Sequence, residues 1–158
     1  FRFEWQFSIG AVAALAHDVI LTFGFFAVTG LEFNLSIIAA ILAIIGYSMN
    51  DTVVVYDRVR ENLRKYKKLS LTDLLNQSIN ETLSRTTMTS ITTLLALGAL
   101  AIFGGAVISG FTLAMIWGVV VGTYSSVFVA APLLMYFGVR REMSGDSAPG
   151  AGDPASSP

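Results

Sequence analysis

Four long apolar stretches divide the chain, and polar residues gather between and after them. The stretches run roughly over residues 7–29, 35–56, 84–103 and 110–137. A helix needs about 20 predominantly apolar residues to cross a bilayer, and each stretch is about that long or longer. The pattern therefore predicts an all-α, polytopic bundle of four transmembrane helices within residues 1–142.

The basic residues all fall on one side of this predicted bundle. The chain holds ten Lys and Arg residues, which lie before the first stretch, between the second and third, in the first turn of the third (Arg85), or after the fourth. The opposite two connections hold no basic residue, and Glu32 is their only charge. Because basic loops stay in the cytoplasm, we expect both chain ends and the long middle loop to be cytoplasmic. The basic run over residues 58–68 is mainly a topology signal, with a contact to a partner or to anionic lipid as a secondary role.

The middle loop also contains the start signal of a helix. Ser70 and Asp73 have capping-box spacing, and apolar residues then recur at roughly helical intervals as far as Leu83. This predicts a cytoplasmic amphipathic helix near residues 70–83, either lying along the membrane interface or packing against the base of the protein itself. Residues 143–158 are rich in Ser, Gly, Ala, Pro and Asp, and we expect a disordered cytoplasmic tail.

The fourth stretch carries a repeat of small residues on one helical face. Such a face lets two helix backbones approach closely in lipid, so we expect it to pack inside the bundle. Further along, Pro132 lacks a backbone donor and predicts a kink near Phe128. The small residues recur at every fourth position and comprise Gly110, Ala114, Gly118, Gly122, Ser126 and Ala130.

The composition narrows the chemistry that this chain can perform. Of its 158 residues, 54% are hydrophobic and 13% are charged, which is too apolar for an ordinary soluble domain. The net charge of −1 gives no bias toward nucleic acid. There is no cysteine and a single histidine, so we expect no disulfide and no cysteine-ligated or histidine-rich metal site. We also expect no cofactor and no enzymatic activity.

Ionisable side chains inside the apolar stretches are the candidate functional residues. Asp51 and Arg85 lie at similar depth, just inside the predicted cytoplasmic boundary, and Asp18 lies near the middle of the first stretch beside His17. A charge at the bilayer centre costs roughly 2.5–3.5 kcal/mol, and such residues usually face a bundle interior or a water path. An ion pair between Asp51 and Arg85 would lower this cost for both. Thr89, one turn after Arg85, continues a hydroxyl-bearing face.

Structural roles stay open for the same side chains. Asp51 and Arg85 could form a static pair that fixes the helix register. Asp18 could make a neutral hydrogen-bonded contact with His17, and Arg85 could instead meet Glu81 one turn back.

Three segments of the chain resemble the SecF family of bacterial membrane proteins, within the resistance-nodulation-division superfamily. They are HDVILTFGFF (residues 17–26), IAAILAIIGYSMNDTVVVYDRVREN (38–62) and NETLSRTTMTSITTLLALGALAIFGG (80–105). The resemblance runs from residue 1 to about residue 141. It implies a half-transporter of six spans, with a periplasmic domain between the first two, of which this chain has the third to the sixth. The chain begins with Phe rather than Met, and we expect a C-terminal piece of a longer protein.

The resemblance also implies a function and roles for particular residues. Proteins of this family use the proton-motive force to promote preprotein translocation across the bacterial inner membrane, together with SecD, the SecYEG channel, SecA and often YajC. The acid and the arginine that the family links to proton movement correspond to Asp51 and Arg85. Thr89 matches a further position of that pathway, and Asp18 matches the acid of the HDV element. We expect Asp51 to gain and lose a proton, with Arg85 biasing its charge.

Other functions fit parts of the pattern. The alternative within the same superfamily is a proton-coupled exporter of small molecules or lipids. Acids on two helices are also found in intramembrane aspartyl proteases, but Asp51 follows Ser48, Met49 and Asn50 rather than the Gly-x-Gly of that class. A structural membrane subunit with static polar pairs is a third option.

Overall fold

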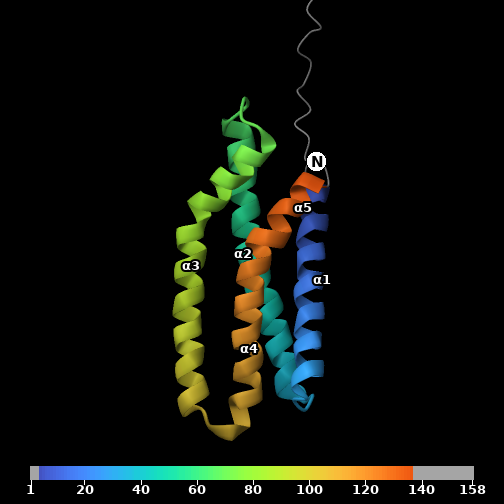
Figure 1. Ribbon diagram of the computed structural model, residues 1–158, viewed down its shortest axis with the longest axis vertical. Coiled ribbons are helices and arrows are strands. Elements are labelled where there is room, and N and C mark those ends of the chain that lie inside the picture. The colour runs from blue at the N-terminus through green and yellow to red at the C-terminus, as the bar shows by residue number, and fades with distance from the viewer. Residues whose placement is uncertain (1–3, 137–158) are drawn as a thin grey trace, which may run out of the picture.

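The computed structural model describes residues 4–136, and every regular element in that range is helical (Figure 1). The elements are α1 (Glu4–Thr29), α2 (Leu35–Lys65), α3 (Leu71–Phe103), α4 (Gly105–Ser125), the π-helical segment η1 (Ser126–Ala130) and α5 (Ala131–Tyr136). With α4, η1 and α5 taken as one rod, the described part has four helices long and apolar enough to cross a membrane. The predicted all-α polytopic bundle is confirmed, whereas the predicted tail at residues 143–158 lies outside the described residues.

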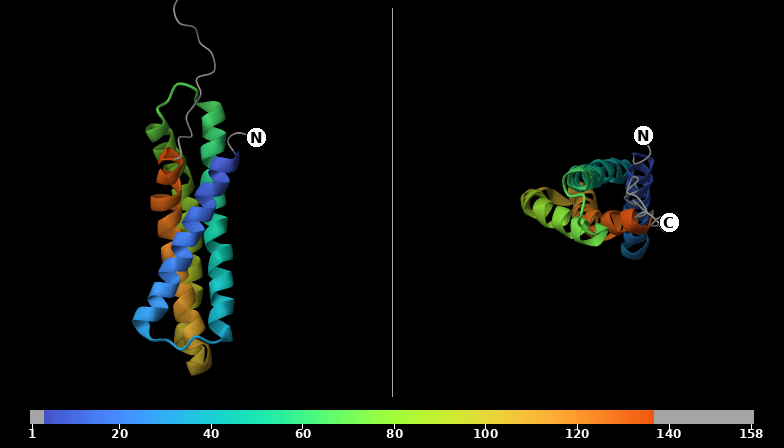
Figure 2. Two further views of the ribbon diagram at one scale, coloured as in Figure 1. Left: turned by 90° about the vertical axis from the view of Figure 1, so that its right-hand side faces the viewer. Right: turned by 90° about the horizontal axis from the view of Figure 1, so that it is seen from above.

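The four rods run along the long axis of the molecule and connect at alternate ends (Figure 1). The α1–α2 and α3–α4 connections share one end, and the α2–α3 connection lies at the other, near the start of α1. Figure 2 shows α2 and α4 in the middle, with α1 and α3 on opposite flanks. The contacts agree, because α2 and α4 form the most extensive helix pair. We call the end with the α2–α3 connection the basic end, because it carries Arg58, Arg60, Arg64 and Lys65.

The small-residue face of α4 explains why α2 and α4 pack so closely. Ala114, Gly118 and Gly122 are buried against α2. A Cβ atom at Gly118 would overlap the side chain of Ile44, and one at Gly122 would lie 3.2 Å from the Cβ of Ser48. The prediction that this face packs inside the bundle is confirmed.

Local signals set where two of the helices begin. The Asn34 side chain accepts a hydrogen bond from the backbone N–H of Ile37 at 3.2 Å, which caps α2. The Ser70 hydroxyl accepts one from the N–H of Asp73 at 3.1 Å, as the capping-box spacing predicted for α3. The sharp α1–α2 turn passes through Gly30, whose φ of 65° favours glycine.

The segment near residues 70–83, where the sequence predicted an amphipathic helix, is helical but is not a separate element. It forms the first turns of α3 and continues without a break into the third span. Its apolar stripe is buried against the protein itself, with Leu74 and Leu75 in one cluster with Val55 and Leu134. Of the two readings of the stripe, the structure supports packing on the base of the bundle. The helix continues because no Gly or Pro interrupts this part of the sequence.

The last rod departs from regular geometry where the sequence predicted a kink. The π-helical turn spans Ser126–Ala130 and includes Phe128, and Pro132 follows in the first turn of α5. Proline cannot donate the helical hydrogen bond that its position requires, and both prolines and π-helical turns are found where helices kink. The phenolic hydroxyl of Tyr56 donates to the carbonyl of Ala130 at 2.8 Å, which ties this segment to α2.

Candidate functional site

Asp18 is the acid around which three helices meet. Its side chain on α1 is 0% exposed. The hydroxyls of Ser48 on α2 and Ser125 on α4 both donate to its Oδ2, and the bond from Ser125 is 2.7 Å long. On the other side, Nδ1 of His17 lies 3.1 Å from Oδ1. The contact with His17 that the sequence left as an option is present, and the two serines add partners from two other helices.

The small-residue face of α4 places these two serines beside Asp18. Gly122 lets α2 approach so closely that a Cβ atom at this position would lie 3.2 Å from that of Ser48. Ser125 lies one turn further along α4 and is fully buried. Neither serine was expected to bind Asp18. The sequence held a signal in the run Gly122-Thr-Tyr-Ser-Ser, because hydroxyl side chains clustered in an apolar span usually bond across helices.

Asp51 lies one turn from Ser48 on α2 and has a contrasting environment. Asp51 is only 3% exposed. Its Oδ2 atom is buried and accepts no hydrogen bond from any residue in the described range. Burying a charged carboxylate without hydrogen bonds is costly, and a bound proton removes that charge. Asp51 therefore combines burial with an unoccupied acceptor atom, whereas Asp18 is held by three side chains.

The predicted ion pair between Asp51 and Arg85 is not formed in this structure. Arg85 is exposed, and no ion pair found within residues 4–136 includes it. The alternative contact with Glu81 is absent too, since that carboxylate accepts from Arg58 at 2.5 Å and from Asn62 at 3.1 Å.

The rotation of α3 explains the position of Arg85. The buried positions Thr82, Thr86 and Ser90 recur every four residues and face the bundle. Arg85 lies on the neighbouring, exposed strip of the helix. Thr89, one turn further along, is half-buried, and its hydroxyl donates to the Arg85 carbonyl at 2.9 Å. Arg85 thus points away from the core of the described bundle, and Thr89 lies between this exposed strip and the core.

A second polar network crosses the middle of the bundle between α2, α3 and α4. The hydroxyl of Ser90 lies 2.6 Å from that of Thr123 and 3.2 Å from the phenolic oxygen of Tyr47. Ser90 also donates to the carbonyl of Thr86 at 2.8 Å. This chain of hydroxyls joins the helices that carry Asp51 and Arg85, and sequence reasoning did not predict the contribution of Thr123.

The basic end is fixed by a polar cluster between α2 and α3. The buried Asn62 donates to the hydroxyl of Ser78 at 2.9 Å. Arg58 bridges Glu61 at 2.7 Å and Glu81 at 2.5 Å at the surface of the same cluster. Within residues 4–136 no three His, Cys, Asp or Glu side chains are grouped as metal ligands would be.

The fold and the buried acids define a multi-pass α-helical membrane protein. The family model for the C-terminal part of the protein export membrane proteins SecD and SecF matches residues 1–140. The chain therefore belongs to the SecD/SecF C-terminal family.

Similar proteins agree with this assignment. The protein translocase subunit SecF of Rhodobacter capsulatus is 61% identical over 140 residues, which are 89% of this chain and 42% of that protein. SecF of Rickettsia akari is 59% identical over 89% of this chain and 46% of that protein. The chain thus spans less than half the length of these relatives.

Two solved structures show the same fold. A crystal structure of SecDF in a super-membrane-facing form matches with a TM-score of 0.83 and 49% identity, over 87% of this chain and 19% of that one. The crystal structure of SecDF from Thermus thermophilus, described as a translocon-associated membrane protein, has a TM-score of 0.83 and 48% identity. This match covers 89% of this chain and 20% of the SecDF chain.

Proposed function

We propose that this chain is the C-terminal membrane part of a SecF-type subunit that promotes preprotein translocation across the bacterial inner membrane by using the proton-motive force. The observation that carries the proposal is the buried, hydrogen-bond-deficient carboxylate of Asp51 in a bundle of this family. The names of the similar proteins favour protein translocation over the export of small molecules or lipids.

The orientation that we propose places the basic end in the cytoplasm. The α2–α3 connection and the start of α1 lie at this end, where the basic residues gather, and the α1–α2 and α3–α4 connections lie at the other (Figure 1). Lys and Arg in short loops favour the cytoplasmic side. Both ends of the chain would then be cytoplasmic, and the α1–α2 and α3–α4 connections would face the periplasm.

In the proposed mechanism Asp51 binds and releases a proton as its access changes between the two sides of the membrane. One elementary charge that crosses the membrane is worth about 2.3 kcal/mol per 100 mV, which is enough to bias two conformations of a bundle. Arg85 attracts the charged form of Asp51 and so favours release of the proton. Thr89, which is half-buried one turn from Arg85 on α3, would line the path that the proton takes.

Asp18 has a different part in this proposal. Its carboxylate holds α1, α2 and α4 together through Ser48 and Ser125. Ser48 is one turn from Asp51, so a movement of α2 that follows protonation of Asp51 would also change the hydrogen bonds of Asp18. We therefore place Asp18 in the proton pathway as the acid whose hydrogen bonds change when α2 moves.

The partners in this proposal are SecD, the SecYEG channel with SecA, YajC and the translocating preprotein. The exposed position of Arg85 supports a contact with SecD, because a charged residue in a span usually pairs with a neighbouring helix rather than with lipid. The solved relatives, in which SecD and SecF form SecDF, give the same indication.

Export assays in inverted membrane vesicles test this proposal. They need the full-length protein with SecD, with and without a proton gradient. Asp51→Asn keeps the shape of the side chain but cannot exchange a proton, and we expect the gradient-dependent part of export to disappear. Asp57→Asn is the matched control, because Asp57 is an exposed acid on the same helix. Unchanged gradient dependence in Asp51→Asn, at equal expression and assembly, would refute the proposed role.

A further inference from the structure

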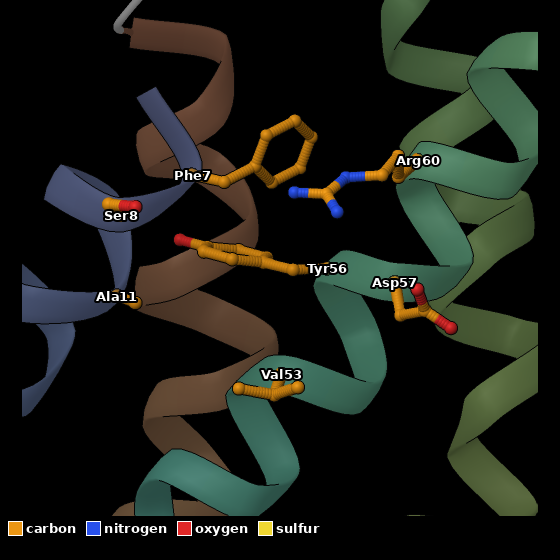
Figure 3. Close-up of a pocket in the computed structure, with 7 residues that line it drawn as sticks. All are labelled: Phe7, Ser8, Ala11, Val53, Tyr56, Asp57 and Arg60. Carbon is orange, nitrogen blue, oxygen red and sulfur yellow. The ribbon is translucent and has the colours of Figure 1, made fainter. Parts of the chain in front are cut away.

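A pocket of about 200 Å³ lies between α1 and α2 at the basic end of the bundle (Figure 3). Aromatic rings from both helices form much of its wall, and a single arginine lies at its mouth. A water molecule has a liquid volume of roughly 30 Å³, so the space can accept a small polar group as well as solvent. The lining residues are Phe7, Ser8, Ala11, Val53, Tyr56, Asp57 and Arg60.

Arg60 is the residue that gives this pocket a chemical preference. Its guanidinium lies 5.2 Å from the centroid of the Phe7 ring, and Figure 3 shows it directed over the pocket between Phe7 and Tyr56. No ion pair in the described range includes Arg60, whereas Arg58 is bound to two carboxylates. The side chain of Asp57 points away from the guanidinium (Figure 3). Arg60 therefore presents its donors to the pocket with its charge uncompensated by a bonded carboxylate.

The apolar surface next to the pocket indicates what kind of anion it would take. Val53 lines the pocket and is 54% exposed. Met49, one turn deeper in the span, is exposed on the same side of α2. A phosphate group held at Arg60 would thus have apolar helix surface directly below it, toward the bilayer centre. Tyrosine is enriched at the depth where the hydrocarbon region meets the headgroups, and Tyr56 is one of the lining residues.

We propose that this pocket binds the phosphate of a membrane phospholipid. Arg60 donates hydrogen bonds to the phosphate oxygens, and one acyl chain follows the exposed surface of Val53 and Met49. Basic pockets between transmembrane helices on the cytoplasmic side are typical headgroup sites, and a guanidinium can bind a phosphate through two donors. Arg60 is the one cation among the described residues that line the pocket, and exposed apolar helix surface adjoins it, so a bilayer lipid fits better than a free phosphate ion. This site is separate from Asp51 and Asp18 and extends the proposed function.

Native mass spectrometry of the full-length protein with SecD, titrated with phosphatidylglycerol, tests the proposal. Arg60→Gln removes the cation, and Arg64→Gln removes the same charge from an exposed position one turn further along α2. We expect Arg60→Gln to weaken one saturable binding event about fivefold or more, and Arg64→Gln to leave it within about twofold. Val53→Phe, which fills the pocket from an exposed position and keeps the charge, is expected to weaken the same event.

Three results would overturn the proposal. Equal losses in Arg60→Gln and Arg64→Gln would show general attraction of anionic lipid to the basic end. The absence of a saturable event in the wild type would show that another segment or a partner covers the pocket. Competition by millimolar inorganic phosphate would show a site for the free ion. Size-exclusion profiles of each variant complex provide the control for folding.

Discussion

Removal of the Ser125 hydroxyl tests how strongly Asp18 joins the helices. In Ser125→Ala the Oδ2 of Asp18 loses a donor at 2.7 Å and keeps that of Ser48. A hydrogen bond to a charged group contributes about 1.5–3 kcal/mol in proteins generally. Polar contacts between membrane helices average about 0.6 kcal/mol and reach about 1.7 kcal/mol. Because one donor remains, we expect the free energy of unfolding to fall by about 1–1.5 kcal/mol.

The adjacent Ser126 provides a matched control for this prediction. It is equally buried, but its hydroxyl donates to the carbonyl of Thr123 in its own rod at 2.9 Å. Ser126→Ala should change the unfolding free energy little, because it breaks no bond between helices and alanine favours the helix. Unfolding of the full-length protein in mixed micelles with rising SDS content, followed by circular dichroism, measures both variants.

A double-mutant cycle then assigns the loss to the contact with Asp18. In an Asp18→Ala background the cost of Ser125→Ala should shrink to that of Ser126→Ala, because the acceptor is gone. An unchanged cost in that background would refute the reasoning, since the effect would then come from packing around Ser125. Equal costs for the two serine variants in the wild-type background would refute it as well.

Two further predictions concern packing and the basic end. Gly118→Leu should lower the unfolding free energy by about 1–3 kcal/mol, because the new side chain would overlap Ile44. Gly98→Leu is the control, because Gly98 has open space around it, and it should cost far less. Similar losses in the two variants would contradict the close approach of α2 and α4. Asn62→Ala should cost about 1–3 kcal/mol because it breaks buried hydrogen bonds between α2 and α3, and the surface change Arg58→Ala should cost less than about 1 kcal/mol. Urea- or SDS-induced unfolding of the same full-length protein measures both pairs of variants. A larger loss in Arg58→Ala than in Asn62→Ala would contradict the second prediction.

The spans, the helix start and the kink were predictable because each depends on a short stretch of sequence. Length and apolarity decide whether a segment can cross a bilayer. The cap at Ser70 and the irregular turn before Pro132 follow from the hydrogen bonds that these residues can and cannot make. The small-residue face around Gly118 likewise predicted that α4 would be approached closely, though not by which helix.

The contacts of the polar side chains were harder to predict because they depend on helix rotation. Hydroxyl residues occur all around the first turns of the third span, so no apolar pattern showed that Thr86 would face inward and Arg85 outward. In the same way Ser48 and Asp51 formed one polar patch in the sequence. The close approach of α4 turns Ser48 toward Asp18, and Asp51 is left without that partner. These rotations are set by packing across the bundle.

The most direct test of the central claim is infrared difference spectroscopy of the full-length protein with SecD in proteoliposomes during a pH change. The account predicts a carboxyl C=O band that appears as the pH falls, is absent in Asp51→Asn and persists in Asp57→Asn. A band that is unchanged in Asp51→Asn would contradict the account, because Asp51 would then exchange no proton.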